Sequence, residues 1–168
     1  MELILMRHGI AETDPPPGGT DSDRPLSEEG LDRTEAAARG LAAVVRELDG
    51  IATSPKKRAR QTAQIVRGVY GKSAPAIEEW PELAESNFTG LCAHMRDFKG
   101  NTLLCSGHEP LLSEFVSELL TGSSSALPIE FKKAGLCVLD VDWGEPGAAP
   151  RATLLWHLTP KLLRQLAR

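Results

Sequence analysis

The sequence predicts an α/β fold of three layers (α/β/α), in which a mostly parallel central sheet with an antiparallel edge lies between helices. Apolar segments typical of buried strands alternate along the chain with segments of helical periodicity. Several strand segments lack the polar alternation of a half-exposed sheet, which places helices on both faces. The last two strand segments are joined by the loop GEPGAAP without a helix, so we expect them to form the antiparallel edge.

Each element in the first half of the chain has a local signal. The run over residues 2–6 is apolar throughout, whereas the segment 10–25 contains three consecutive prolines and two glycines, which exclude regular structure. Apolar residues then recur at helical spacing after Ser27, a suitable helix cap. The predicted elements are a strand over 2–6, a helix from Ser27 to Gly50, a strand in GIATSP that ends at Ser54, and a helix from Pro55 to about Val69. Ser54 is expected to cap the second of these helices.

The second half of the chain continues this alternation. An apolar run ends at Cys105 and leads into a polar turn, after which Pro110 opens a helix. The predicted elements are a weak strand in APAIEEW, a short helix or irregular segment in FTGLCAHMRDFKG, a strand over 102–105, a helix from Pro110 to about Leu120, strands in GLCVLDVDW and RATLLWHL, and a terminal helix in PKLLRQLAR.

Length and composition limit the class of protein. With 168 residues, 41% of them hydrophobic, the chain can bury one core, and we expect a single domain over residues 1–168. A net charge of −4 with both signs intermixed, and 5% aromatic residues, argue against a nucleic-acid or membrane partner. The first apolar run is too short for a signal peptide or a membrane span, so a cytoplasmic protein is expected. The three cysteines are far apart, which suits reduced thiols.

Three short motifs place polar side chains at the ends of predicted strands. RHG (Arg7, His8 and Gly9) follows the first strand, SPKKRARQT brings Arg58 to the start of a helix, and SGHEP brings His108 to another strand end. Because ligands of open α/β sheets bind outside the carboxyl ends of the strands, these side chains are expected to converge. Two guanidinium groups and two imidazoles suit a tetrahedral dianion such as a phosphoryl group. Gly9 lets the backbone turn away and the ligand approach.

The motifs LMRHG, RPLSEEG, SPKKRARQT and SGHEP, in this order over nearly the whole chain, resemble the histidine phosphatase superfamily, which includes phosphoglycerate mutases and acid phosphatases. The short chain without an inserted helical domain is similar to bacterial phosphohistidine phosphatases of the SixA type. The resemblance implies a phosphoglycerate mutase-like fold. It also implies that His8 is the nucleophile, that Arg7 and Arg58 bind the phosphate, and that His108 is the second histidine of the pocket.

The expected reaction is a phosphoryl transfer to His8 and then to water. Neutral His8 attacks phosphorus through one ring nitrogen, while the other nitrogen donates to a nearby carbonyl and fixes the tautomer. Two arginines and the second histidine stabilise the charge of the transition state, so neither a metal nor a cofactor is expected. Related enzymes protonate the leaving group with a glutamate, for which WPELAESNFTG offers Glu82 and Glu85. The sequence does not show which of the two glutamates is the acid. Both also fit the role of solvated loop carboxylates.

Three functions fit these residues. The first is hydrolysis of phosphohistidine on a phosphorylated protein, such as a histidine-containing phosphotransfer domain, because a pocket without a lid domain stays open to a folded partner. The second is hydrolysis of a small phosphate ester, and the third is a module that binds a phosphorylated ligand without turnover. A cysteine phosphatase is disfavoured because Leu111 stands where the loop after Cys105 would need an arginine. His94 and His157 lack partners at metal-ligand spacing.

Overall fold

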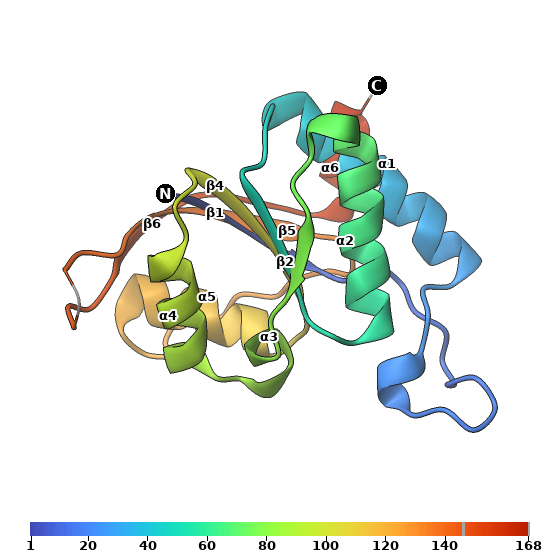
Figure 1. Cartoon of the computed structure of the whole chain (residues 1–168), viewed down its shortest axis with the longest axis horizontal. Coiled ribbons are helices and arrows are strands. Elements are labelled where there is room, and N and C mark those ends of the chain that lie inside the picture. The colour runs from blue at the N-terminus through green and yellow to red at the C-terminus, as the bar shows by residue number, and fades with distance from the viewer. Residues whose placement is uncertain (146, 168) are drawn as a thin grey trace.

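The computed structural model describes residues 1–145 and 147–167, which form a six-stranded mixed sheet between two layers of helices (Figure 1). The strands lie in the order β3-β2-β4-β1-β5-β6. Their bounds are Glu2–Arg7 for β1, Gly50–Thr53 for β2, Ile77–Glu79 for β3, Thr102–Gly107 for β4, Leu136–Asp142 for β5 and Arg151–Leu158 for β6. The two central strands, β4 and β1, carry the ends at which the RHG and SGHEP motifs begin.

The strand directions confirm the predicted sheet. β1 is parallel to β4, and β2 is parallel to both β4 and β3. β5 is antiparallel to β6, as the short connection between them predicts, and it is also antiparallel to β1. The architecture is therefore mostly parallel with an antiparallel edge, as predicted.

Helices cover both faces of the sheet (Figure 1). One face carries α1 (Glu28–Val44), α2 (Lys57–Tyr70) and α6 (Pro160–Leu166), and the other carries α3 (Glu82–Glu85), α4 (Phe88–Asp97) and α5 (Leu111–Thr121). Two short 3-10 helices, η1 (Asp21–Asp23) and η2 (Gly71–Ser73), lie in the connections. No helix among the described residues is both long enough and apolar enough to cross a membrane.

Some element boundaries differ from those predicted. Helix α1 ends at Val44, well before Gly50, because the backbone turns extended at Val45 while the side chain of Val45 stays in the core. The predicted helix cap Ser54 is also displaced, since α2 begins at Lys57 with Lys56 at its cap position. The short helix α3 has no apolar periodicity long enough to predict it.

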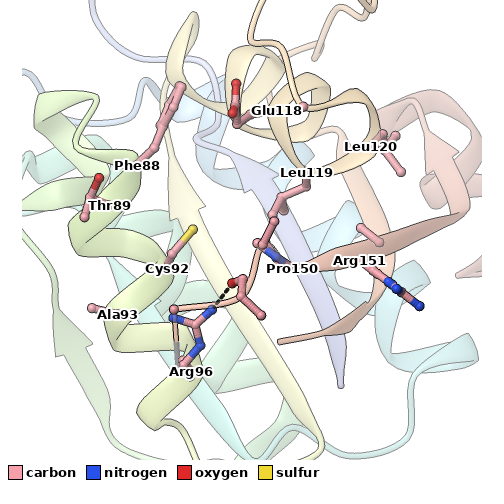
Figure 2. Close-up of a pocket in the computed structure, with 15 residues that line it drawn as sticks. Phe88, Thr89, Cys92, Ala93, Arg96, Glu118, Leu119, Leu120, Pro150 and Arg151 are labelled. Carbon is pink, nitrogen blue, oxygen red and sulfur yellow. Dashed lines mark hydrogen bonds between the residues drawn. The ribbon is translucent and has the colours of Figure 1, made fainter. Parts of the chain in front are cut away.

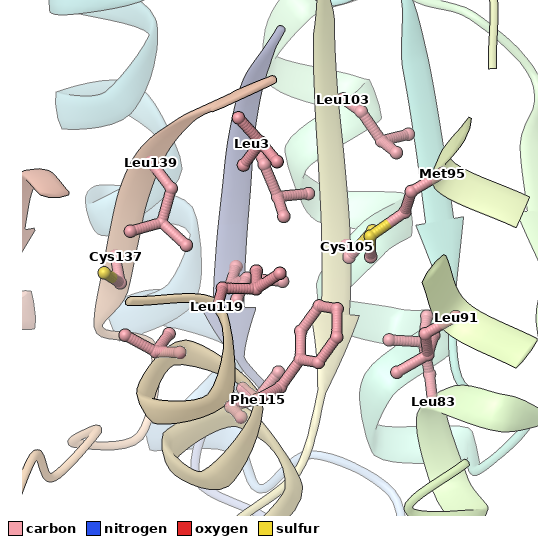
Figure 3. Packing of buried hydrophobic residues seen from close by; sticks show 14 of the residues in the cluster. Leu3, Leu83, Leu91, Met95, Leu103, Cys105, Phe115, Leu119, Cys137 and Leu139 are labelled. Carbon is pink, nitrogen blue, oxygen red and sulfur yellow. The ribbon is translucent and has the colours of Figure 1, made fainter. Parts of the chain in front are cut away.

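Two hydrophobic cores lie on opposite sides of the sheet, and β1 contributes to both by strict alternation. Leu3 and Leu5 face α4 and α5 together with Phe115 (Figure 3), whereas Ile4 and Met6 face α1, α2 and α6. All five side chains are at most 1% exposed. Burying a leucine-sized side chain contributes about 1.5–3 kcal/mol. The strand that carries the RHG motif is therefore held firmly on both faces.

The strand register brings the three motifs to one edge of the sheet. Arg7 of β1 is paired with Gly107 of β4, and the His8 backbone N–H continues the ladder by donating to the Gly107 carbonyl at 3.0 Å. The Ser54 backbone N–H donates to the Ser106 carbonyl at 3.0 Å in the same way. Because these strands are parallel, their carboxyl ends place the residues that follow them side by side.

Candidate active site

His8 is held with a fixed ring orientation at the end of β1. Its side chain is buried, with the residue only 7% exposed, and Nδ1 lies 2.7 Å from the carbonyl oxygen of Gly9. A carbonyl oxygen only accepts hydrogen bonds, so Nδ1 carries the proton and Nε2 keeps its lone pair. Nε2 accepts a hydrogen bond from Nε of Arg58 at 3.3 Å. The unprotonated nitrogen of His8 therefore faces a guanidinium group.

The guanidinium group of Arg58 donates a hydrogen bond from each of its three nitrogen atoms. Besides the contact with His8, Nη1 donates to the backbone carbonyl of Asp21 at 2.7 Å and Nη2 donates to a carboxylate oxygen of Asp21 at 3.0 Å. Arg58 lies in the first turn of α2 and is 6% exposed. A planar guanidinium held by three hydrogen bonds loses little further freedom when it binds an oxyanion.

His108 lies across the site from His8. The two ring centroids are 5.0 Å apart and the rings are tilted by 54°. Nε2 of His108 lies 2.8 Å from Oγ of Ser54, which itself accepts a hydrogen bond from the backbone N–H of Lys56 at 3.2 Å. A hydroxyl group both donates and accepts hydrogen bonds, so either tautomer of neutral His108 fits this contact. Nδ1 is buried and has no partner among the described residues.

Arg7 and Gly9 complete the RHG motif. Nη1 of Arg7 donates to the carbonyl of Phe131 at 2.6 Å, and its buried Nε has no partner in the described part of the chain. The backbone N–H of Gly9 donates to Oγ1 of Thr62 at 3.0 Å. A Cβ on Gly9 would overlap the hydroxyl of Thr34, so a glycine is needed there for packing. The ligand approach expected of Gly9 remains a prediction.

Burial keeps both imidazoles neutral. Desolvation, with smaller contributions from the charges of Arg58 and Arg7, lowers the pKa of His8 to about 4, although the hydrogen bond to Gly9 opposes this shift. Desolvation also lowers the pKa of His108 to about 3, and the neighbouring His8 and Arg58 act in the same direction. At neutral pH the site therefore combines two neutral imidazoles with permanent positive charge from the arginines.

The two predicted acids lie on α3, which borders the site. The carbonyl oxygen of Leu83 is 3.7 Å from the position that a Cβ would take on Gly107. Oε1 of Glu82 lies 3.4 Å from Nε2 of His94, and its Oε2 is buried without a partner among the described residues. Glu85 is exposed at the last position of α3. Neither carboxylate has a hydrogen bond to His8 among the described residues, so the role of either as the leaving-group acid stays a prediction.

The sequence did not reveal two residues of this site. Asp21 lies in η1 and accepts from Arg58, Arg24 and Lys56, and the hydrogen bond from Arg58 holds the pKa of Asp21 well below its usual range. The only signal was an acidic loop, TDSDRP, that follows RHG in the sequence. Ser54 was predicted as a helix cap and instead contacts His108.

A cavity lies at the end of the sheet opposite to the histidine pair. It measures about 660 Å³ and is lined by α4, the end of α5 and the start of β6 (Figure 2). Nη2 of Arg96 donates to the carbonyl of Ala148 at 2.9 Å in its wall, and Cys92 faces the cavity. The lining includes neither histidine of the candidate site. Among the described residues, no group of three or more His, Cys, Asp or Glu side chains is placed to hold a metal ion.

The comparison with protein families agrees with this geometry. The family model of the histidine phosphatase superfamily (branch 1) matches residues 3–96, a segment that contains Arg7, His8 and Arg58. The chain belongs to the histidine phosphatase superfamily. The similarity of the chain to SixA phosphatases, in sequence and in structure, supports a phosphatase enzyme.

The relatives and solved structures point to one subgroup of this superfamily. The chain is 29% identical over 164 residues to the phosphohistidine phosphatase SixA of Escherichia coli, covering 95% of this chain and 94% of that protein. It is 33% identical over 138 residues to an uncharacterized protein of Picosynechococcus, covering 81% and 82% of the two chains. A structure of the protein histidine phosphatase SixA complexed with tungstate superposes with a TM-score of 0.79 at 27% identity, over 97% of this chain and 99% of that one. The chain is thus of the SixA type.

Proposed function

We propose that the protein hydrolyses phosphohistidine on a phosphorylated partner protein, through a covalent phosphoryl group on His8 and without a metal ion. The observation that carries this proposal is the state of the His8 ring. Its Nδ1–H donates to the Gly9 carbonyl, and its unprotonated Nε2 faces Arg58 at 3.3 Å. A buried imidazole with a fixed tautomer and an unprotonated Nε2 is an activated nucleophile at neutral pH.

The first step forms the bond between Nε2 of His8 and phosphorus and breaks the bond between phosphorus and the leaving group. Negative charge is spread over the three equatorial oxygens of the phosphoryl group. Arg58 and Arg7 supply permanent positive charge, and neutral His108 with its proton on the unpartnered Nδ1 supplies a further donor in this mechanism. In the second step a water molecule attacks the phosphorus, and His8 leaves as the neutral imidazole.

The geometry supports a tetrahedral oxyanion as the bound group. The SixA structure to which this chain is similar is complexed with tungstate, which is a tetrahedral oxyanion. When an anion enters, Arg58 can exchange its contact with His8 for a contact with an oxygen of the ligand, while Asp21 continues to hold the other side of the guanidinium. Donors that are already oriented stabilise a transition state without a reorganisation cost.

Phosphohistidine is favoured over a phosphate ester because no acid among the described residues is positioned at the histidine pair. Glu82 is engaged with His94 and Glu85 is exposed, and neither has a described contact with His8. An alkoxide leaving group needs a proton in the transition state, whereas an imidazole leaves more readily. The similarity to SixA, named as a phosphohistidine phosphatase, supports the same substrate class.

The test compares three substrates in the presence of a chelator: a phosphorylated histidine-containing phosphotransfer domain, an aryl phosphate and a sugar phosphate. We expect the phosphorylated domain to be hydrolysed with the highest kcat/KM and His8→Asn to abolish its hydrolysis. The control His157→Asn removes a histidine from β6 and should keep full activity. A preference for the sugar phosphate, or full activity of His8→Asn, would contradict the proposal.

A further inference from the structure

A basic pocket of about 460 Å³ opens at the edge of the sheet that carries His8. Its described lining contains no carboxylate and five cationic side chains, namely Arg7, Arg33, Lys132, Lys133 and Arg164. Arg7 belongs both to this basic pocket and to the RHG motif, so the pocket adjoins the candidate active site. Its volume lies within the range of about 300–1,000 Å³ that ligand sites span, and it is larger than one phosphoryl group needs.

The segment that carries the two lysines is tied to the end of β1. The backbone N–H of Ala134 donates to the carbonyls of both Arg7 and His8, each at 3.1 Å, and the backbone N–H of Arg7 donates to the Gly135 carbonyl at 3.0 Å. These backbone hydrogen bonds hold Lys132 and Lys133 beside the RHG motif, and they do not depend on the conformation of the lysine side chains. The charge of Lys133 reaches His8, since it contributes to the lowered pKa of that histidine.

The two arginines come from helices that pack unusually closely. A Cβ on Gly40 of α1 would overlap the carbonyl oxygen of Leu163 in α6, and one on Gly30 would overlap the carbonyl of Ile10. Glycines at these contacts let α1 approach both α6 and the RHG segment. Arg33 of α1 and Arg164 of α6 therefore meet over the same pocket.

Positive charge is concentrated in the basic pocket, although the net charge of the whole chain is −4. Arg33 pairs with Glu29 and Lys132 with Glu130, but these four side chains are all more than half exposed, so solvent screens the pairs strongly. In the described part of the chain, neither Lys133 nor Arg164 has an ion-pair partner. Cations gathered in a concave site repel one another unless an anion joins them, so the basic pocket has a strong preference for negative charge.

We propose that the basic pocket is a second anion subsite, which takes a carboxylate or phosphate group of the same substrate molecule whose phosphoryl group enters the His8 site. This inference rests on the proposed function, because it assumes that the phosphoryl group lies at His8. On a protein substrate the second group is an acidic side chain near the phosphohistidine, and on a small substrate it is a second acidic group. Arg7 lies between the two positions and can contact both.

The test uses two pairs of substrates that differ only in the second charge. One pair consists of phosphohistidine peptides flanked by glutamates or by glutamines, and the other of 4-carboxyphenyl phosphate and phenyl phosphate. The variant is Arg33→Gln combined with Arg164→Gln, with Arg33→Gln alone in case the double variant does not fold. The matched control is Arg39→Gln, because Arg39 also lies on α1 and pairs with the residue four positions before it, as Arg33 does, but does not line the pocket.

We expect the double variant to lose about tenfold or more in kcat/KM on the carboxylated member of a pair, since charge-assisted hydrogen bonds are lost. The uncharged member should change less than about twofold, and Arg39→Gln should change neither. The pair that shows the difference identifies the source of the second anion. Equal effects on both members of both pairs would overturn the inference. The proposed function fails separately, if no phosphohistidine peptide is hydrolysed while the phenyl phosphates are.

Discussion

Burial of a neutral His8 makes the folded protein sensitive to acid, and the size of the effect follows from its pKa. In the unfolded chain the pKa of histidine is about 6.5, whereas in the folded protein burial lowers the pKa of His8 to about 4. Between these values the unfolded state binds more protons, so stability falls as the pH falls from about 6.5 towards 4. One pKa unit corresponds to about 1.4 kcal/mol, and the loss due to His8 between pH 7 and pH 5 is therefore about 2 kcal/mol.

The assay is urea unfolding at pH 7 and pH 5 for the natural protein and for His8→Asn. Asparagine can keep the hydrogen bond to the Gly9 carbonyl but does not titrate, so the variant should lose about 2 kcal/mol less stability between the two pH values. His94→Asn is the control, because it removes an imidazole whose side chain is 45% exposed. If His8→Asn loses as much stability between pH 7 and pH 5 as the natural protein does, His8 is not held neutral by burial. The role of activated nucleophile assigned to His8 would then be wrong.

Three further predictions concern single side chains around the site. Arg58→Met removes an oriented donor, and kcat should fall by about a hundredfold or more in assays with the phosphorylated domain. Asp21→Asn leaves the backbone contact to Arg58 in place, so kcat/KM should fall by only about tenfold, as measured with the same substrate. Gly9→Ala forces a Cβ against Thr34 and should lower the free energy of urea unfolding by about 1–3 kcal/mol, and an unchanged stability would show that the close packing at Gly9 is absent.

The sequence was sufficient to predict the sheet and the convergence of His8, Arg58 and His108. Buried strands and amphipathic helices have strong local signals, and polar residues at the carboxyl ends of neighbouring parallel strands must lie near one another. The pairing of β1 with β4 places His8 beside the end of β4, and backbone hydrogen bonds alone determine this position. These features depend on regular structure, which is why they could be inferred without coordinates.

Contacts made by loops could not be inferred in the same way. Asp21 approaches Arg58 because the proline- and glycine-rich loop folds back as η1, and no periodic pattern determines that path. Lys133 joins the site only through the hydrogen bonds of the segment before β5. The position of Glu85 depends on where the short helix α3 ends, at Ser86 in a left-handed conformation with φ of 52°.

The most direct test of the account is rapid acid-free quenching of the reaction with a substrate that carries a labelled phosphoryl group, followed by location of the label. We expect acid-labile, base-stable phosphate on His8, attached through Nε2, because Nδ1 is committed to the Gly9 carbonyl. The label should be missing from His8→Asn. Label on His108, label on Nδ1 of His8, or turnover with no trapped phosphoryl group under single-turnover conditions would contradict the account.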